Sequence, residues 1–231
     1  AGVAQIWSML GIATTIVSPT LPPTAWEADA IELTRALQAQ QLEDVRQRLT
    51  QMSLQAVEMT LIGLAAKGDT TEAMQLAEMA IEERGPSAVL WFQKGVAAYM
   101  ADDREGSEQA YMQASEEDPF YGPALCNLSA IRQQQGDAQG ALQMALRALQ
   151  ALPEDPICLR VAILAHLRVG NREAARELLD SRRDLLERIE RVALETVLQQ
   201  DDTAPTERTH AFPLHADLMR ELGRAFVEQH K

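Results

Sequence analysis

Catalysis or metal binding in this chain would depend on its four histidines, two cysteines and 34 carboxylates. His210 and His215 stand five residues apart across a proline, a spacing that suits neither a metal pair on one helical face nor a zinc finger. His166 falls at a phase of its helix that packs inward, which indicates a satisfied core histidine. Cys126 and Cys158 have no partner base in the sequence pattern and are interpreted as small apolar core residues. These residues predict no catalytic group and no metal site.

The glycines, serines and carboxylates also lack the patterns that enzymes use. No glycine-rich phosphate loop is present, because the glycines recur at turn positions. The serines lack the sharp strand–turn–helix elbow of a nucleophile, and the carboxylates fall on positions typical of solvated surface. We therefore expect a protein without enzymatic activity and without a cofactor.

Charge and composition restrict the class of protein further. The 231 residues carry 21 Lys and Arg against 34 Asp and Glu, a net charge of -13. Such an acidic chain repels phosphate backbones, so no nucleic-acid partner is expected. Hydrophobic residues make up 46% but aromatic ones only 4%. Because straight-chain residues favour helices and aromatic or β-branched residues favour strands, this balance predicts an all-α fold.

The N-terminal segment carries no charge before Glu27. Within residues 1–18, apolar residues recur on one helical face and polar residues on the other, and two interpretations stay open. The helix is either a membrane anchor or remnant of a secretory signal, or it packs on protein. Residues 19–23 are rich in proline and predict a stiff joint. Two helices are expected over 24–53, the first with Thr24 as its N-cap and Glu27 completing a capping box.

Internal repetition with a period of 34 residues is the strongest pattern in the chain. A turn position recurs in four units, and each time an Asp or Asn follows it: Gly68, Asp102, Gly136 and Gly170. Small residues recur where two antiparallel helices of a unit would touch: Ala73, Ser107, Ala141 and Ala175, and further on Ala80, Ala114 and Ala148. A glycine ends a helix readily because it adopts a left-handed conformation without strain.

This pattern resembles the tetratricopeptide-repeat (TPR) family. The second unit has the family's motif residues Trp91, Gly95, Tyr111, Ala114 and Pro119. The resemblance covers residues 54–182 as four in-register helix–turn–helix units and implies a right-handed α-solenoid. The second unit departs from the pattern with Asp102 at the turn, and the fourth with Arg182 at a small-residue position.

The flanks of the array have their own expected roles. Residues 24–53 are a degenerate repeat or N-terminal cap, and residues 183–199 a C-terminal capping helix. Its buried face is expected to contain Leu185, Ile189, Val192 and Val197. A polar linker over 200–213 and a last helix over 214–231 follow.

The resemblance also implies where a partner would bind. In this family the first helix of each unit lines a concave groove. The matching positions predict a partner-binding surface formed by Ile62, Phe92, Val96, Tyr99, Met100, Cys126, Ala130, Arg160, Leu164, Leu167 and Arg168. The surface is mostly apolar, which favours an apolar peptide or an amphipathic helix as ligand. The Lys and Asn with which the family's chaperone-binding members hold a peptide carboxylate are absent. Alternatively, the chain covers the groove with its own terminal helix.

Two functions follow from these expectations. The first is a protein–protein interaction scaffold in a membrane-associated complex, reached through residues 1–18 and located in the bacterial cell envelope. The second is a chaperone for an exported or secretion-system subunit, for which a cytoplasmic location is the alternative.

Overall fold

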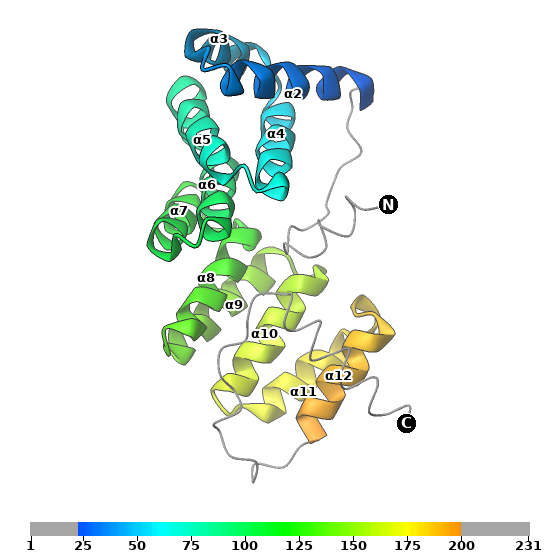
Figure 1. Cartoon of the computed structure of the whole chain (residues 1–231). Coiled ribbons are helices and arrows are strands. Elements are labelled where there is room, and N and C mark those ends of the chain that lie inside the picture. Colours follow the sequence, from blue (N-terminus) through cyan, green and yellow to red (C-terminus); the bar gives the residue numbers. More distant parts are fainter. Residues whose placement is uncertain (1–22, 200–231) are drawn as a thin grey trace. The chain divides into compact units, whose positions relative to one another are not determined.

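The computed structural model describes residues 23–199, which form eleven α-helices and one 3-10 turn and contain no strand (Figure 1). The helices pack as consecutive pairs, so the predicted all-α repeat array is confirmed. The apolar helix expected over 1–18, most of the joint at 19–23, the linker over 200–213 and the helix over 214–231 lie outside the described residues. Two compact units are present, and the division between them falls after Ala124.

The N-terminal unit contains the first six helices and the start of a seventh. Their bounds are α2 Pro23–Gln38, α3 Leu42–Gln51, α4 Leu54–Lys67, α5 Thr70–Arg84, α6 Ala88–Met100, α7 Arg104–Glu117 and α8 Gly122–Gln134, which continues into the other unit. Helix α2 packs on α4 and α3 on α5, while α4 packs on α5 and α6, and α6 on α7. Each helix pair therefore stacks on the next pair, as Figure 1 shows from α2 and α3 down to α6 and α7.

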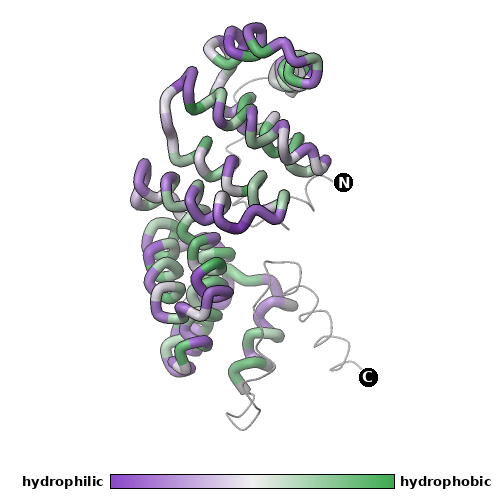
Figure 2. The backbone as a smooth tube through the Cα atoms, turned by 60° about the vertical axis from the view of Figure 1, so that its left-hand side comes forward, coloured by the Kyte–Doolittle hydropathy of each residue, from purple (hydrophilic) through white to green (hydrophobic). Residues whose placement is uncertain are grey.

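The C-terminal unit comprises the rest of α8 and four further helices. These are α9 Ala138–Ala151, α10 Pro156–Arg168, α11 Arg172–Ser181 and α12 Arg188–Gln199, with the 3-10 turn Arg183–Leu185 before the last. Helix α10 packs on both α9 and α11, and α12 contacts α11. Along the tube in Figure 2, each helix alternates between hydrophobic and hydrophilic stretches, as expected for helices with one buried face.

The turns between paired helices have the geometry that the repeat pattern predicts. Gly68, Gly136 and Gly170 have φ of 90°, 84° and 78°, and Asp102 occupies the same turn position with φ of 61°. The left-handed conformation is therefore present even where the glycine is missing. The next residue caps the following helix in three units, because Asp103, Asp137 and Asn171 accept hydrogen bonds from backbone N–H groups three residues on.

The small residues of the repeat lie where the helices meet. Ala73, Ser107, Ala141 and Ala175, and likewise Ala80, Ala114 and Ala148, are at most 1% exposed. Gly95 of α6 lies directly against Tyr111 of α7, since a Cβ atom placed there would come within 2.6 Å of the tyrosine ring. These contacts set the spacing of α6 and α7 and support the register of the repeat.

The expected N-cap of the first helix is wrong. Helix α2 begins at Pro23, so Thr24 lies inside the helix and is not its N-cap; proline suits the first turn of a helix because it has no N–H to satisfy.

The capping helix does not run unbroken over 183–199. A 3-10 turn ends at Leu185, Leu186 is extended, and α12 starts only at Arg188. The buried face consists of Leu186, Ala193, Leu194 and Leu198, while Val197 is exposed. Leu185 packs against the core as expected, but the break shifts the helical phase of α12, which explains why Val197 is exposed.

Among the helices of residues 23–199, none combines the length and the apolarity that a bilayer crossing requires.

Candidate protein-binding site

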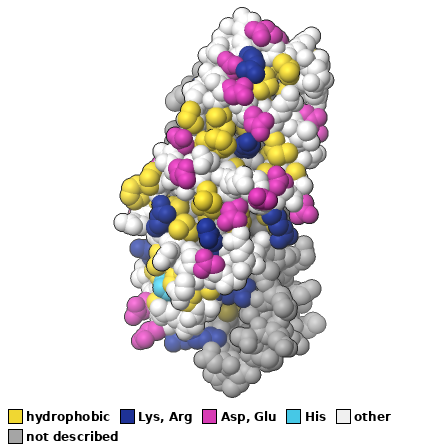
Figure 3. Space-filling view, turned by 90° about the vertical axis from the view of Figure 1, so that its left-hand side faces the viewer, with side chains coloured by type: hydrophobic (Ala, Val, Ile, Leu, Met, Phe, Trp, Pro, Cys, Tyr) yellow, Lys and Arg dark blue, Asp and Glu magenta, His cyan; other side chains and the backbone are white. Residues whose placement is uncertain are grey.

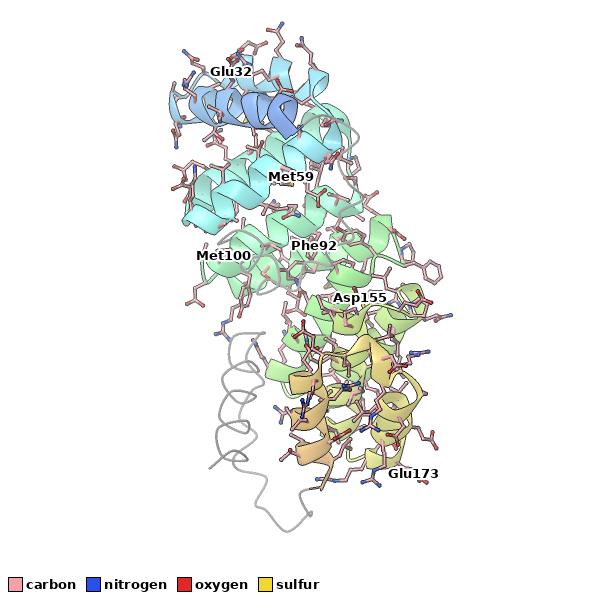
Figure 4. The ribbon with its side chains drawn as sticks, turned by 90° about the vertical axis from the view of Figure 1, so that its right-hand side faces the viewer. Glu32, Met59, Phe92, Met100, Asp155 and Glu173 are labelled. Carbon is pink, nitrogen blue, oxygen red and sulfur yellow. The ribbon has the colours of Figure 1, made fainter. Side chains whose placement is uncertain are left out.

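Helices α4 and α6, the first helices of two successive repeats, hold the residues of the N-terminal unit that were predicted to bind a partner. Both start at a serine whose side chain accepts a hydrogen bond from a backbone N–H three residues on, Ser53 for α4 and Ser87 for α6. In Figure 4, Met59 marks α4, and Phe92 and Met100 mark α6. We define the first-helix face as the predicted residues on these two helices together with Glu58 of α4: Glu58, Ile62, Phe92, Val96, Tyr99 and Met100.

The first-helix face is less open than the sequence suggests. Ile62 and Val96 are 4% exposed and Phe92 is 1% exposed, whereas Met100 is 38% exposed and Tyr99 is half-buried. The prediction that Ile62, Phe92 and Val96 are accessible to a partner is therefore wrong. The part of this face that solvent reaches lies at Tyr99 and Met100 on α6 and at the half-buried Glu58 on α4.

Phe92 is buried because two tyrosines pack on its ring. The ring of Tyr111 on α7 lies 5.6 Å from that of Phe92, and the ring of Tyr121, just before α8, lies 5.5 Å away in an edge-on arrangement. Aromatic pairs at this separation add stabilisation beyond the area they bury. Tyr121 lies beyond the motif residues of the second unit, so the repeat pattern gave no signal that it covers Phe92.

Beside the aromatic cluster lies a carboxylate in an unusually apolar position. Glu58 of α4 accepts a hydrogen bond of 3.2 Å from the Nε2 atom of Gln93, a buried residue of α6. Burial raises the pKa of Glu58, and the hydrogen bond from Gln93 opposes this rise only in part. The pKa of Tyr121 is also raised, first by burial and then by the negative charges of Glu58 and Asp118.

No cation within the described residues compensates the charge of Glu58. Among the basic side chains of the same unit, Arg46 pairs with Glu82 and Glu83, and Lys94 pairs with Glu78. A half-buried carboxylate with one amide donor retains acceptor capacity for a further donor. Chemically, this corner of the first-helix face can accept a hydrogen bond from a cationic or N–H group of a ligand.

In the C-terminal unit, most of the predicted binding residues belong to the core. Arg160 of α10 is 5% exposed and forms an ion pair with Glu190 of α12, so it is not free to bind a partner's carboxylate. Cys126 is buried against Cys158, and Leu164 belongs to the same core, on which the half-buried Leu167 packs.

The remaining predicted residues of this unit differ in how closely the structure matches their expected burial. Ala130 and Arg168 are half-buried, and burial lowers the pKa of Arg168. His166 is buried as expected, and burial lowers its pKa. The expectation of a satisfied histidine is not met within the described part of the chain, because its Nδ1 atom has no hydrogen-bond partner among residues 23–199. Among residues 23–199, no group of three or more His, Cys, Asp or Glu side chains could hold a metal ion.

Together, the fold and this surface define a TPR-type helical repeat array. Solved structures with the same fold include that of PilF from Pseudomonas aeruginosa, 16% identical, covering 76% of this chain and 83% of the other, with a TM-score of 0.56. Another is YrrB, described as a TPR protein with an unusual peptide-binding site, 15% identical, covering 73% and 90%, with a TM-score of 0.52. The chain therefore has the TPR fold, as the repeat pattern predicts.

Comparison with known sequences provides less information about this chain than comparison with known folds. No family model matches the chain. A probable biofilm formation methyltransferase, WspC of Pseudomonas aeruginosa, is 29% identical over 92 residues, which are 40% of this chain. The matched part is 22% of the length of WspC. The similarity carries no activity over to this chain.

Proposed function

We propose that this protein is a non-enzymatic scaffold that binds a segment of another protein on the first-helix face of its N-terminal unit. The observation that carries the proposal is Glu58, a half-buried carboxylate that lies next to apolar and aromatic side chains and has no cationic partner within the described residues. Burying a charge without a counter-charge is costly, and a ligand cation would remove part of that cost. The favoured ligand is an apolar or amphipathic segment with a Lys or Arg among its apolar residues.

The distribution of charge along the chain supports a basic partner. Residues 23–124 carry 18 acidic and 7 basic side chains, whereas residues 125–199 carry ten of each. On the face drawn in Figure 3, acidic and basic side chains lie among apolar ones. A strongly negative unit attracts a positive partner over a distance and accelerates association at low ionic strength.

Solvent-accessible apolar residues of α4 and α6 supply the rest of the expected contact. Met100 is exposed, Tyr99 is half-buried, and Met59, next to Glu58, is half-buried. Methionine adapts to irregular apolar surfaces, which suits a site that accepts a helix or an extended segment. Polar recognition by Glu58 would set the position of the ligand, and these side chains would add buried apolar area.

The chaperone for an exported or secretion-system subunit stays the alternative, because it would use the same face for an apolar segment. Membrane association is part of the proposal through residues 1–18, whose uncharged sequence supports a place in a membrane-associated complex of the cell envelope. A pull-down with mass spectrometry would distinguish the two. A stable set of membrane-complex subunits favours the scaffold, and an unassembled exported subunit favours the chaperone.

Binding to designed peptides tests the proposed site directly. Three amphipathic peptides that differ only in a central Arg, Gln or Glu are titrated against the full chain by fluorescence anisotropy. We expect the Arg peptide to bind most tightly and the Glu peptide least. In the variant Glu58→Gln the advantage of Arg over Gln should fall by about tenfold, since hydrogen bonds to charged groups contribute ~1.5–3 kcal/mol.

Glu117→Gln is the matched control. It removes one negative charge from an exposed position on α7 of the same unit and should leave the preference for Arg nearly unchanged. If Glu58→Gln and Glu117→Gln reduce the preference for the Arg peptide equally, only the overall charge of the unit attracts the peptide. The proposed role of Glu58 would then be wrong.

A further inference from the structure

The two cysteines of the chain meet in the core of the C-terminal unit. The Sγ atom of Cys126 on α8 lies 3.4 Å from the Sγ atom of Cys158 on α10. Both side chains are buried, at 5% and 2% exposure, within one apolar cluster that also contains Leu125 and Leu159. No third cysteine exists in the sequence, so neither thiol has another partner of its kind within the chain.

We propose that Cys126 and Cys158 form a disulfide under oxidising conditions and thereby tie α8 covalently to α10. A disulfide has an S–S distance of about 2.05 Å, so the two sulfur atoms need to approach by little more than 1 Å. On this proposal, rotations of the two side chains supply this change. The pair lies 32 residues apart in the sequence, so the bond would link the first helix of one repeat to that of the next.

The reaction balances as thiol–disulfide exchange with a small disulfide such as oxidised glutathione. One cysteine, as its thiolate, attacks the small disulfide, forms a mixed disulfide and releases one small thiolate. The thiolate of the second cysteine then attacks the protein sulfur of the mixed disulfide and releases the second small thiolate. The two protons lost by the cysteines go to the released thiolates, and the small disulfide takes the two electrons.

The surroundings of Cys158 determine when this reaction occurs. Its pKa is raised by the hydrogen bond with Cys126 and by burial, with a further contribution from Asp155, which caps α10 by accepting hydrogen bonds from the N–H groups of Ile157 and Cys158. A buried, protonated thiol reacts slowly. The bond should therefore form while the unit folds or opens, and once formed it should be protected from reducing thiols.

A cross-link between residues 126 and 158 should stabilise the folded chain measurably. In the unfolded state, the cross-link closes a loop of more than 30 residues and reduces the number of conformations that this loop can adopt. We expect the melting temperature of the oxidised protein to lie roughly 10 °C above that of the reduced protein.

The experiment refolds the full chain from urea in buffers with oxidised or reduced glutathione. Peptide mapping by mass spectrometry without reductant should find one cross-linked pair containing Cys126 and Cys158, and no glutathione adduct. Circular dichroism then compares the melting temperatures of the two forms. In the control Cys158→Ala, oxidised glutathione should give no rise in melting temperature.

Several results would overturn the inference. Free thiols, stable glutathione adducts or disulfide-linked dimers as the main oxidised product would show that the two sulfur atoms do not come together in the fold. A cross-link that forms but lowers the melting temperature would show that the helices must be distorted to accommodate it. If the alanine variant does not fold, the comparison of oxidised with reduced wild-type protein still decides the question.

Discussion

Replacing Gly95 with alanine should destabilise the protein although alanine is the better helix former. Gly95 lies within α6, where alanine normally stabilises a helix by about 0.5–1 kcal/mol. A Cβ atom at this position would lie 2.6 Å from Cε1 and 2.7 Å from Cδ1 of Tyr111. Carbon atoms in favourable contact are about 3.5–4.0 Å apart, so the ring or the helix must move by roughly 1 Å.

The surroundings of Tyr111 leave little room for that movement. The tyrosine is 2% exposed and packs on Phe92 with the ring centres 5.6 Å apart. Overpacking a close-packed core typically costs ~1–3 kcal/mol. After the helix-propensity gain is subtracted, Gly95→Ala should lower the free energy of unfolding by up to about 2.5 kcal/mol.

Gly63 provides a matched control inside α4. It is a mid-helix glycine like Gly95, but a Cβ atom there would meet nothing within 4 Å. Gly63→Ala should therefore raise the free energy of unfolding by about 0.5–1 kcal/mol. Both substitutions add one methyl group, but they should change the free energy of unfolding in opposite directions.

Urea unfolding followed by far-UV circular dichroism measures both effects. A double variant with Tyr111→Leu should abolish the loss caused by Gly95→Ala, because the ring that collides with the new methyl group is gone. If Gly95→Ala stabilises the protein as much as Gly63→Ala does, the packing of Tyr111 on α6 is refuted, and with it the register of the second repeat.

Four further outcomes are expected. Asp102→Gly should raise the free energy of unfolding by about 0.5–1 kcal/mol in urea titrations, because Asp102 has φ of 61° and glycine adopts this conformation without strain. Ala141→Leu should lower the melting temperature at a cost of ~1–3 kcal/mol, because Ala141 is fully buried between helices. Phe92→Ala should reduce the free energy of unfolding by ~3–5 kcal/mol, so a loss of partner binding in this variant would have to be separated from unfolding. Glu58→Gln should stabilise the protein at pH 7. Burial raises the pKa of Glu58, so folding favours the protonated carboxyl group. The stability that protonated Glu58 contributes is lost as the pH rises through its folded-state pKa, whereas glutamine stays neutral. Thermal melts of wild type and Glu58→Gln should therefore converge below the ordinary pKa of a glutamate and diverge toward neutral pH.

The repeat architecture was predictable because it depends on local sequence rules. A left-handed turn position, a capping Asp or Asn and small residues at helix contacts recur every 34 residues, and each has its own physical requirement. Even Asp102, which departs from the glycine pattern, adopts the conformation that the period demands. A fold of this kind can be predicted from sequence because independent local signals agree.

The exposure of individual binding residues was not predictable in the same way. Phe92 is covered by Tyr121, and Arg160 is neutralised by Glu190, and both of these partners lie outside the motif of the repeat that they cover. A repeat motif specifies contacts within and between units, but it contains no information on side chains that enter from a turn or a flanking helix. The break before α12 had no glycine or proline to mark it. Glu58 was not among the predicted binding residues, because the repeat pattern does not show that its carboxylate is partly buried beside Gln93.

Glu190 makes the last helix indispensable to the repeat that precedes it. Its carboxylate accepts a hydrogen bond from the backbone N–H of Glu187, which closes the start of α12, and also pairs with the buried Arg160 of α10. A shortened chain that ends with the fourth repeat would lose this ion pair and would expose the core residues that Leu194 and Leu198 of α12 cover. We therefore expect the smallest stable C-terminal fragment to extend beyond the repeat boundary, through α12.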